Sequence, residues 1–184
     1  MLVMIGASAS GKTEIAKIII QKYGFEKMVT YTTRSMRLGE TNGVDYHFIS
    51  DEEFHNKMKN AEFLETTQYN NHLYGTALKN IGDDKVLIVD VNGANVLHNA
   101  LKDQAVFFYL QAPKEIRMKR MLSRGDHLED IKRRLKKDEE HFVKEHIDQV
   151  DYVINTDTAT LDQLANQIYT IYQETISQKR FKIR

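Results

Sequence analysis

The most chemically suggestive stretch of the sequence is the run Gly6-Ala7-Ser8-Ala9-Ser10-Gly11-Lys12-Thr13, which fits the pattern G-x-x-x-x-G-K-[ST]. The backbone N–H groups of such a loop point inward and form a cradle for anions. Its two glycines, Gly6 and Gly11, allow backbone conformations that side chains would forbid. We expect Lys12 to place its charge on the β- and γ-phosphates of a nucleotide and Thr13 to offer a hydroxyl to Mg²⁺.

The segments on either side of this loop supply the context that the motif requires. Leu2–Ile5 is a short apolar run that predicts a strand, and residues 12–23 carry apolar side chains at close to helical spacing. A helix that begins at the loop adds unpaired N–H groups and the positive end of its dipole. Strand, loop and helix in this order distinguish a phosphate-binding loop from a chance match in an ordinary turn.

Four apolar runs and a weaker fifth predict the core of the fold. Their near-continuous hydrophobicity suits strands that are covered on both faces. The four runs are Leu2–Ile5, Val86–Val91, Val106–Leu110 and Tyr152–Ile154, and the weaker one is Met28–Thr32. Helices are expected at residues 12–23, 93–102, 114–123, 128–145 and 160–178. This alternation predicts an α/β fold with a parallel five-stranded core sheet.

Residues 34–82 interrupt that alternation. The segment's three short strand-like pieces are Val44–Ile49, Glu62–Gln68 and His72–Thr76. Asn70-Asn71 predicts a tight turn between the last two, and Ser50 with Glu53 forms a capping box that predicts a helix. We therefore divide the chain into a core, residues 1–33 and 83–184, and a small α+β insert, residues 34–82. An insert after the second strand would overhang the carboxyl ends of the core strands, where α/β sheets bind ligands.

A second polar cluster lies at the start of this insert. Arg34 and Arg37 are three positions apart, and a glycine-containing turn separates them from Tyr46. Two guanidinium groups and a phenol hydroxyl that converge on one point would bind a phosphate monoester. The alternative is a solvated charged loop, which is the commoner arrangement for a pair of arginines.

The stretch from Thr32 to Phe48 resembles the signature of guanylate kinases, which reads T-[ST]-R, then R, an acidic residue, G and Y-x-F. The resemblance covers nearly the whole chain in order, through the motifs Glu62-Phe63-Leu64-Glu65, Tyr74-Gly75-Thr76, Asp90-Val91-Asn92-Gly93, Arg120 to Gly125, Arg133-Arg134-Leu135 and Asp151 to Asn155. It implies a P-loop three-layer fold with a GMP-binding insert and a helical lid at about residues 120–140. It also implies the reaction ATP + GMP → ADP + GDP with Mg²⁺, with dGMP as an alternative acceptor.

The resemblance also assigns roles to individual residues. Positions that hold the GMP phosphate match Thr30, Arg34, Arg37, Tyr46 and Tyr74; positions that read guanine match Glu65 and Thr76; Gly75 and Asp90 fall at further substrate-binding positions. Arg120, Arg124 and Arg134 match arginines of the lid and its hinge, and with Lys12 and Arg34 they make up the expected catalytic set. Asn155 matches a residue near the adenine of ATP. Most of the lysines of segment 128–145 are expected to form a solvated face.

Several features depart from the family pattern: the segment between Thr76 and Val86 is shorter than usual, the lid is one residue short, and the residue at position 88 differs. The family usually has an acidic residue two positions before Asp90, and this chain has Ile88 there. In the family that residue helps to organise the Mg²⁺ shell or the donor phosphates. Two alternatives therefore stay open: a kinase for another small phosphomonoester, and a catalytically weakened guanylate-kinase-like binding module. Lys12 argues against the module, and Glu65 argues for guanine, because one carboxylate can accept hydrogen bonds from N1–H and N2–H₂ together.

Composition sets the remaining expectations. The 184 residues include 26 Lys+Arg and 26 Asp+Glu, and this balance argues against nucleic acid as the main partner. No stretch reaches the roughly 18 apolar residues of a membrane span, so no membrane partner is expected. The sequence has no cysteine, which fits a reducing compartment. We expect a cytoplasmic enzyme that is a monomer or a homodimer.

Overall fold

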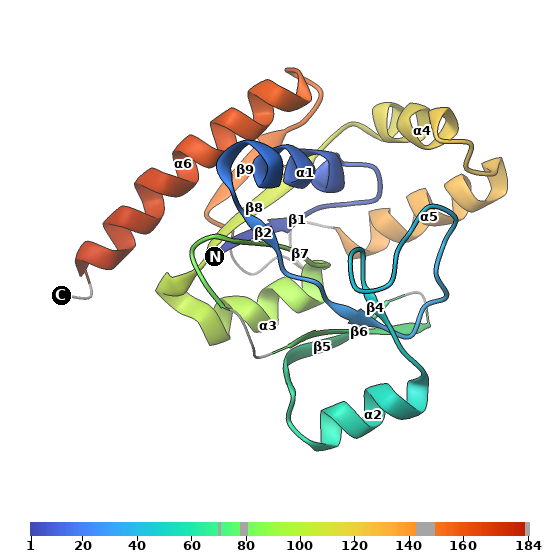
Figure 1. Ribbon diagram of the computed structural model, residues 1–184. Coiled ribbons are helices and arrows are strands. Elements are labelled where there is room, and N and C mark those ends of the chain that lie inside the picture. The colour runs from blue at the N-terminus through green and yellow to red at the C-terminus, as the bar shows by residue number, and fades with distance from the viewer. Residues whose placement is uncertain (70, 78–80, 143–149, 183–184) are drawn as a thin grey trace.

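The computed structural model describes residues 1–69, 71–77, 81–142 and 150–182. A parallel sheet forms its core (Figure 1). Its five strands lie in the order β2-β7-β1-β8-β9, and every neighbouring pair is parallel. The strands are β1 (Leu2–Ile5), β2 (Glu26–Lys27), β7 (Lys85–Ile88), β8 (Val106–Gln111) and β9 (Tyr152–Asn155). The predicted α/β class and the five-stranded parallel core are confirmed.

Helices cover both faces of this sheet. The helices of the described chain are α1 (Lys12–Tyr23), α2 (Asp51–Lys59), α3 (Val91–Leu101), α4 (Lys114–Ser123), α5 (Leu128–His141) and α6 (Leu161–Lys182), with the 3₁₀ turn η1 (Lys102–Gln104). Figure 1 shows α1 and α6 side by side on one face, with α3 on the other. No helix among the described residues is long and apolar enough to cross a membrane.

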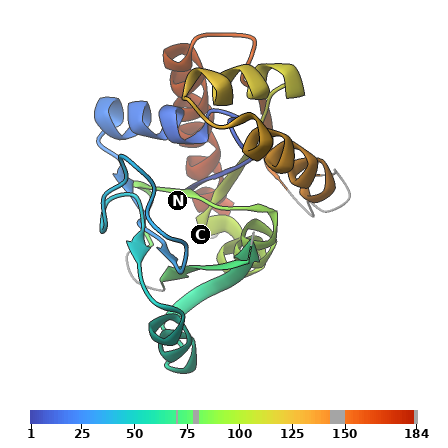
Figure 2. The same ribbon diagram turned by 90° about the vertical axis from the view of Figure 1, so that its right-hand side faces the viewer.

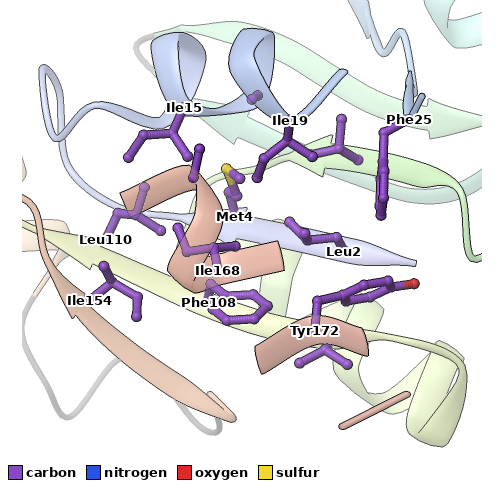
Figure 3. Close-up of a cluster of buried hydrophobic side chains, with 14 of the residues drawn as sticks. Leu2, Met4, Ile15, Ile19, Phe25, Phe108, Leu110, Ile154, Ile168 and Tyr172 are labelled. Atoms are coloured by element: carbon purple, nitrogen blue, oxygen red, sulfur yellow. The ribbon is translucent and has the colours of Figure 1, made fainter. Parts of the chain in front are cut away.

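The alternation of side chains along β1 divides the core into two clusters. Leu2 and Met4 are fully buried in the cluster under α1 and α6 (Figure 3). Val3 and Ile5 are fully buried in the cluster under α3. Successive residues of a strand point to opposite faces, so a continuous apolar run is what a doubly covered strand requires. These two clusters hold the end of β1 in place, and the glycine loop begins directly after that end.

A second, smaller sheet carries most of the predicted insert. Its order is β4-β3-β6-β5, with β3 parallel to β4 and the other pairs antiparallel. The strands are β3 (Tyr31–Thr32), β4 (His47–Phe48), β5 (Phe63–Tyr69) and β6 (His72–Ala77). Helix α2 begins at the predicted cap, where the Ser50 hydroxyl accepts a hydrogen bond from Glu53 N at 3.1 Å. In Figure 2, α2 and this sheet lie at the bottom of the molecule, and α4 and α5 lie at the top.

Three of the predicted strands are wrong in extent, and one of them is Val44–Ile49, of which only His47–Phe48 forms a strand, β4. The run Met28–Thr32 is not one strand, because the chain leaves the core sheet after β2 and only Tyr31–Thr32 pairs again, as β3 of the second sheet. The run Val86–Val91 ends early, at Ile88. Asp90 instead caps α3, since its carboxylate accepts a hydrogen bond from Gly93 N at 2.8 Å. Asn70 of the predicted tight turn lies outside the described residues.

The predicted break between two helices after Ser123 is present. Helix α4 ends at that residue and α5 begins at Leu128. The two helices share a small apolar cluster of Met121, Ile131 and Leu135, and Ala9 of the glycine loop packs against it. The helical pair therefore rests directly on the glycine loop.

Candidate active site

Most of the predicted site residues line one cavity of about 300 Å³ at the carboxyl ends of β1 and β7. The cavity lies where the glycine loop, the second sheet and α5 meet. The predicted residues in its wall are Gly6, Ser8, Lys12, Thr13, Thr30, Arg34, Arg37, Tyr46, Glu65, Tyr74, Gly75, Thr76 and Asp90. Ala9, Ser10, Gly11, Arg120, Arg124, Arg134 and Asn155 do not line it. Ile88 does line it, next to Val89 and Asp90.

The glycine loop turns tightly against β8, and Gly6 is what permits the turn. Its φ is +152°, and a Cβ there would lie 2.2 Å from the backbone oxygen of Leu110. Gly11 has a φ of +101° and stands at the N-cap of α1. Both glycines are therefore required by backbone geometry, as the motif predicts.

Lys12 folds its ammonium group back over the loop. Its Nζ donates to the backbone oxygens of Gly6 at 2.6 Å and Ala7 at 2.9 Å. Burial lowers the pKa of Lys12 to about 8; Asp138 opposes this shift, and the guanidinium groups of Arg117 and Arg124 add to it. The ammonium thus lies in a site where a further anion would stabilise its charge.

A carboxylate from α5 already contacts this loop. The Asp138 side chain accepts hydrogen bonds from Ser8 N at 3.0 Å and from the Ser8 hydroxyl at 3.3 Å. It also forms an ion pair with Arg117 of α4, with 2.7 Å between Nη1 and Oδ2, and accepts from the Tyr69 hydroxyl at 3.3 Å. Asp138 is only 1% exposed, so it joins the glycine loop, α4 and the second sheet in one buried contact.

Asp138 is a buried exception on a helix whose Lys132 and Lys136 are exposed, and a signal for it exists in the sequence. The buried residues of α5 are Ile131, Leu135 and Asp138. Their spacing of four and then three residues places them on one stripe of a helix. A charged residue that continues an apolar stripe is expected to face inward.

On the other side of the cavity, Arg34 is held by a carboxylate of its own loop. The Glu40 oxygens accept from Arg34 Nη2 at 2.8 Å and Nη1 at 3.0 Å, and from the backbone N of Arg37 at 2.7 Å. Burial alone would lower the pKa of Arg34, but the hydrogen bonds and charge of Glu40 raise it. The guanidinium lies 5.4 Å from the ring centre of Tyr46, which in turn contacts the ring of Tyr74. Arg34, Tyr46 and Tyr74 therefore lie together, and Arg37 lines the same cavity, as the phosphate-monoester hypothesis requires.

Glu65 places a buried carboxylate, with one oxygen lacking a hydrogen-bond partner in the described chain, in the wall of the cavity. The residue is 6% exposed, and its Oε1 accepts a hydrogen bond from the Thr76 hydroxyl at 2.6 Å. Its Oε2 is buried and has no hydrogen-bond partner among the residues that the structure describes. Burial raises the pKa of Glu65 to about 7, with a further contribution from the negative charge of Asp90. A Cβ on Gly93 would lie 3.3 Å from Oε2, so that glycine keeps space beside the carboxylate.

The three predicted lid arginines lie outside the cavity wall. Arg120 donates to Ala9 O at 3.2 Å and to Thr156 O at 2.6 Å, so it fastens the glycine loop to the end of β9. Arg124 and Arg134 both pair with Asp126, at 3.5 and 3.1 Å. The positive charges of two of these arginines still act on cavity residues. Arg124 helps to lower the pKa of Lys12, and Arg134 helps to lower the pKa of Arg37. Their catalytic roles stay predictions.

Of the residues predicted for the metal and for adenine, Thr13 lines the cavity and Asn155 does not. Thr13 is exposed in the cavity, which suits a hydroxyl ligand of Mg²⁺. No group of three or more acidic or histidine side chains gathers as a metal site in the described chain. Mg²⁺ usually binds through one or two protein oxygens together with phosphate oxygens and water, so this ligand set fits it. Asn155 is exposed at the end of β9, where its Oδ1 accepts from Gln111 Nε2 at 2.6 Å.

Two further cavity residues were not predicted from the sequence. Lys27 follows the glycine loop's helix, and its Nζ donates to the backbone oxygens of Val44 at 3.0 Å and Asp45 at 2.7 Å. Thr67 donates to Asp90 Oδ2 at 3.0 Å. Both contacts tie the second sheet and its loop to the core, and no local sequence pattern indicates either of them.

Comparisons with known proteins agree with this geometry. A family described as Guanylate kinase matches residues 1–175. The guanylate kinase of Chlorobaculum tepidum is 35% identical over 91% of this chain and 91% of its own, and that of Lactobacillus acidophilus is 35% identical over 86% and 81%. The crystal structure of guanylate kinase from Anaplasma phagocytophilum matches with a TM-score of 0.72 and 25% identity, over 95% of this chain and 84% of that one.

Proposed function

The chain belongs to the guanylate kinase family and phosphorylates GMP to GDP with ATP, and we propose that its two nucleotides meet in the cavity described above. The observation that carries this assignment is the buried carboxylate of Glu65, whose Oε2 lacks a hydrogen-bond partner in the described part of the chain. A buried polar atom without a partner is costly unless a ligand supplies one. Guanine offers two donors on one edge, N1–H and N2–H₂, and both would reach a single carboxylate.

The glycine loop is the proposed donor site. Backbone N–H groups and Lys12 would hold the β- and γ-phosphates of ATP, and Asn155 would lie near the adenine. Thr13 would hold Mg²⁺, which supplies neutralisation of the phosphate charges when it is bound. In the absence of nucleotide, Lys12 donates to the neutral oxygens of Gly6 and Ala7. When ATP binds, phosphate oxygens would take their place, and hydrogen bonds to these charged acceptors are stronger.

The loop from Arg34 to Tyr46 is the proposed acceptor-phosphate site. Arg34, Arg37, Tyr46, Tyr74 and Thr30 would orient the phosphate of GMP, with Gly75 and Asp90 completing the wall. An oxygen of that phosphate forms the new bond to the γ-phosphorus, and the bond from that phosphorus to ADP breaks. Such a transfer depends mainly on positioning and on charge stabilisation, so a general base is not needed.

Guanine reading is assigned to Glu65 and Thr76. Thr76 donates its hydroxyl to Oε1 of Glu65 and so fixes the carboxylate in the cavity wall, with Oε2 left for a further donor. Adenine lacks the paired donors on the corresponding edge and would leave this buried oxygen unsatisfied. A site of this kind rejects such analogues strongly. The same reading accepts dGMP, because the contacts described here involve the base and the phosphate.

The helical pair α4–α5 is the proposed lid, within a core of residues 1–33 and 83–184 that carries the acceptor insert 34–82. Arg120, Arg124 and Arg134 would stabilise charge on the transferring phosphoryl group after rearrangement of the α4–α5 turn. The cytoplasmic location and the monomeric or homodimeric state stay predictions.

The test is a coupled assay of ADP release with GMP, dGMP, AMP, CMP and UMP as acceptors. Turnover with GMP and dGMP, and at least about a hundredfold lower kcat/KM with AMP, would support the assignment of Glu65. Equal turnover with several acceptors would support a kinase for another phosphomonoester. Binding of GMP without turnover would support the weakened binding module.

A further inference from the structure

We propose that Asp138 is a built-in competitor of the donor phosphates: in the nucleotide-free enzyme its carboxylate occupies an anion position of the glycine loop, and ATP must displace it. Asp138 thereby sets the affinity for ATP without touching the acceptor. This inference rests on the proposed use of the glycine loop as the donor site, and the experiment below separates the two.

The contacts of Asp138 are those of an anion bound to the loop. Its oxygens accept from the backbone N of Ser8 at 3.0 Å and from the Ser8 hydroxyl at 3.3 Å. Both groups belong to the loop, and both Ser8 and Asp138 line the cavity. A carboxylate that accepts a loop N–H is the same kind of interaction that a phosphate oxygen would make there.

Charge makes the two anions mutually exclusive. The Ser8 N–H is a single donor and cannot fully serve a carboxylate and a phosphate oxygen at once. Asp138 also acts on the Lys12 ammonium, whose pKa it raises against the effect of burial. A triphosphate would need the same N–H and the same ammonium, and like charges at close range repel strongly where water is excluded.

Arg117 makes the exchange feasible. Its guanidinium lies 2.7 Å from Asp138 Oδ2 and 3.4 Å from Ser8 O, and its side chain is 8% exposed. If Asp138 simply left, a buried cation would lose its partner, which is strongly unfavourable. An arriving phosphate would replace the carboxylate as that partner. The anion changes while the buried arginine stays paired.

The end of α5 is placed so that Asp138 can leave without unfolding the helical pair. The apolar cluster that joins α4 and α5 uses Met121, Ile131 and Leu135, all of which precede Asp138. The Tyr69 hydroxyl of the second sheet donates to Asp138 Oδ1 at 3.3 Å. A rotation of the Asp138 side chain would therefore break polar contacts and leave intact both the α4–α5 cluster and the packing of Phe142 against the cluster under α3.

The experiment measures the dissociation constants of ATP, of inorganic tripolyphosphate and of GMP by calorimetry for Asp138→Asn and for the unmodified protein. Asn keeps the shape of the side chain and removes its charge. We expect ATP and tripolyphosphate to bind about 10- to 150-fold more tightly to the variant, the range of one charge-assisted hydrogen bond. The affinity for GMP should stay within about twofold, and KM for ATP should fall without an equal rise in kcat.

A matched control and a second variant keep the proposal testable. Glu139→Gln removes a neighbouring charge of α5 that pairs outward with Lys114 at 2.6 Å, and it should leave ATP binding unchanged. If Asp138→Asn lowers the melting temperature too far for calorimetry, Tyr69→Phe removes one hydrogen bond to the carboxylate and should tighten ATP binding several-fold. Unchanged or weaker ATP binding in the folded variant overturns the proposal.

A third variant distinguishes failure of this inference from failure of the donor-site assignment. Lys12→Ala should abolish measurable tripolyphosphate binding if the glycine loop is the donor site. If Lys12→Ala weakens binding while Asp138→Asn does not strengthen it, the competitor proposal alone is wrong. If neither variant changes binding, the donor site lies elsewhere and both proposals are wrong.

Discussion

The cavity has a donor half, formed by the glycine loop and Asp138, and an acceptor half, formed by the loop from Arg34 to Tyr46 and by Glu65. Both halves hold a buried arginine against a carboxylate, but they differ in where that carboxylate comes from. In the acceptor half, Arg34 pairs with Glu40, six residues further along the same loop. In the donor half, Arg117 pairs with Asp138, which comes from another helix and also takes a backbone N–H of the glycine loop. The Arg34–Glu40 pair holds together a single loop, whereas the Arg117–Asp138 pair holds a carboxylate from α5 against the glycine loop, where we propose that ATP displaces it.

The two halves also differ in what they leave unsatisfied. The ammonium of Lys12 is satisfied by the loop's own carbonyl oxygens, whereas Glu65 Oε2 has no partner in the described chain. A ligand at the donor half must therefore replace existing contacts, and a ligand at the acceptor half supplies a missing one. This difference favours strong selectivity for the acceptor base and a moderate, adjustable affinity for the donor.

The largest expected effect is on the donor half. We predict that Lys12→Ala lowers turnover more than about 100-fold, because it removes a preorganised charge at the transferring phosphates. The melting temperature should change little, since the contacts of Lys12 are confined to the loop. Steady-state kinetics with thermal unfolding would check this, with Lys17→Ala as the control, an exposed lysine of α1 that pairs with Glu14. Near-normal turnover would remove the glycine loop from the mechanism.

The next effect concerns the acceptor half. We predict that Glu65→Ala weakens GMP binding about 10- to 150-fold, because a charge-assisted hydrogen bond contributes roughly 1.5–3 kcal/mol. ATP binding should stay the same, and selectivity against AMP should decrease. Calorimetry with each nucleotide would check this, and Glu62→Gln, at an exposed position that pairs with Lys57, is a suitable control. Equal losses for ATP and GMP would show that the two halves are not independent.

The raised pKa of Glu65 predicts a pH dependence for the acceptor half alone. Only the ionised carboxylate accepts hydrogen bonds from both guanine donors, and burial holds its pKa at about 7 in the unliganded protein. GMP affinity should therefore rise about tenfold from pH 6 to pH 8, as the carboxylate loses its proton. Titrations at several pH values would check this, and Glu65→Gln should flatten the profile. A profile of GMP binding that stays flat in the unmodified protein would contradict it.

The raised pKa of Glu65 also makes the stability of the fold depend on pH, but in the opposite direction to GMP affinity. Between the ordinary pKa of a glutamate, 4.5, and about 7, the folded protein holds a proton on Glu65 that the unfolded chain has lost. The contribution of Glu65 to the free energy of unfolding should therefore fall as the pH rises through this window. The loss should be smaller in the presence of GMP, which stabilises the ionised form.

The sequence predicts the parts of the site that local patterns encode. Gly6 is needed because β8 passes too close for a Cβ, and the glycine spacing of the loop indicates this without a structure. The helices at residues 12–23 and 114–123 are confirmed with the predicted bounds. The parallel core follows from apolar runs such as Val106–Leu110, which only a doubly covered strand requires.

Contacts between distant segments could not be predicted in the same way. The 130 residues that separate Ser8 from Asp138 are brought together by the fold, and no local pattern links them. The unsatisfied oxygen of Glu65 likewise depends on its neighbours from β6 and α3. The strand prediction for residues 28–32 failed because the chain changes sheets there, and hydrophobicity does not report which sheet a strand joins.

The smallest expected effect comes from Ile88, where this chain departs from the family pattern. Ile88 ends β7 at the carboxyl edge of the core sheet, and it both lines the cavity and packs partly against the apolar cluster under α1 and α6. We predict that Ile88→Asp raises turnover with GMP about two- to tenfold, because a carboxylate in the cavity wall beside Asp90 can orient water bound to Mg²⁺. The gain should appear in kcat and leave GMP binding unchanged, which would confine the effect to the donor half.

The partial burial of Ile88 sets the cost of this change and supplies its control. Placing a polar group where the isoleucine packs should lower stability by about 1–3 kcal/mol, which for a chain of this size is roughly 2–12 °C in melting temperature. Ile88→Asn loses the same packing without adding a charge, so it should lower the melting temperature similarly and leave turnover unchanged. Kinetics and thermal unfolding of both variants would decide the matter. If Asp and Asn lower the melting temperature alike and neither raises turnover, Ile88 serves the core, and the donor half needs no second carboxylate.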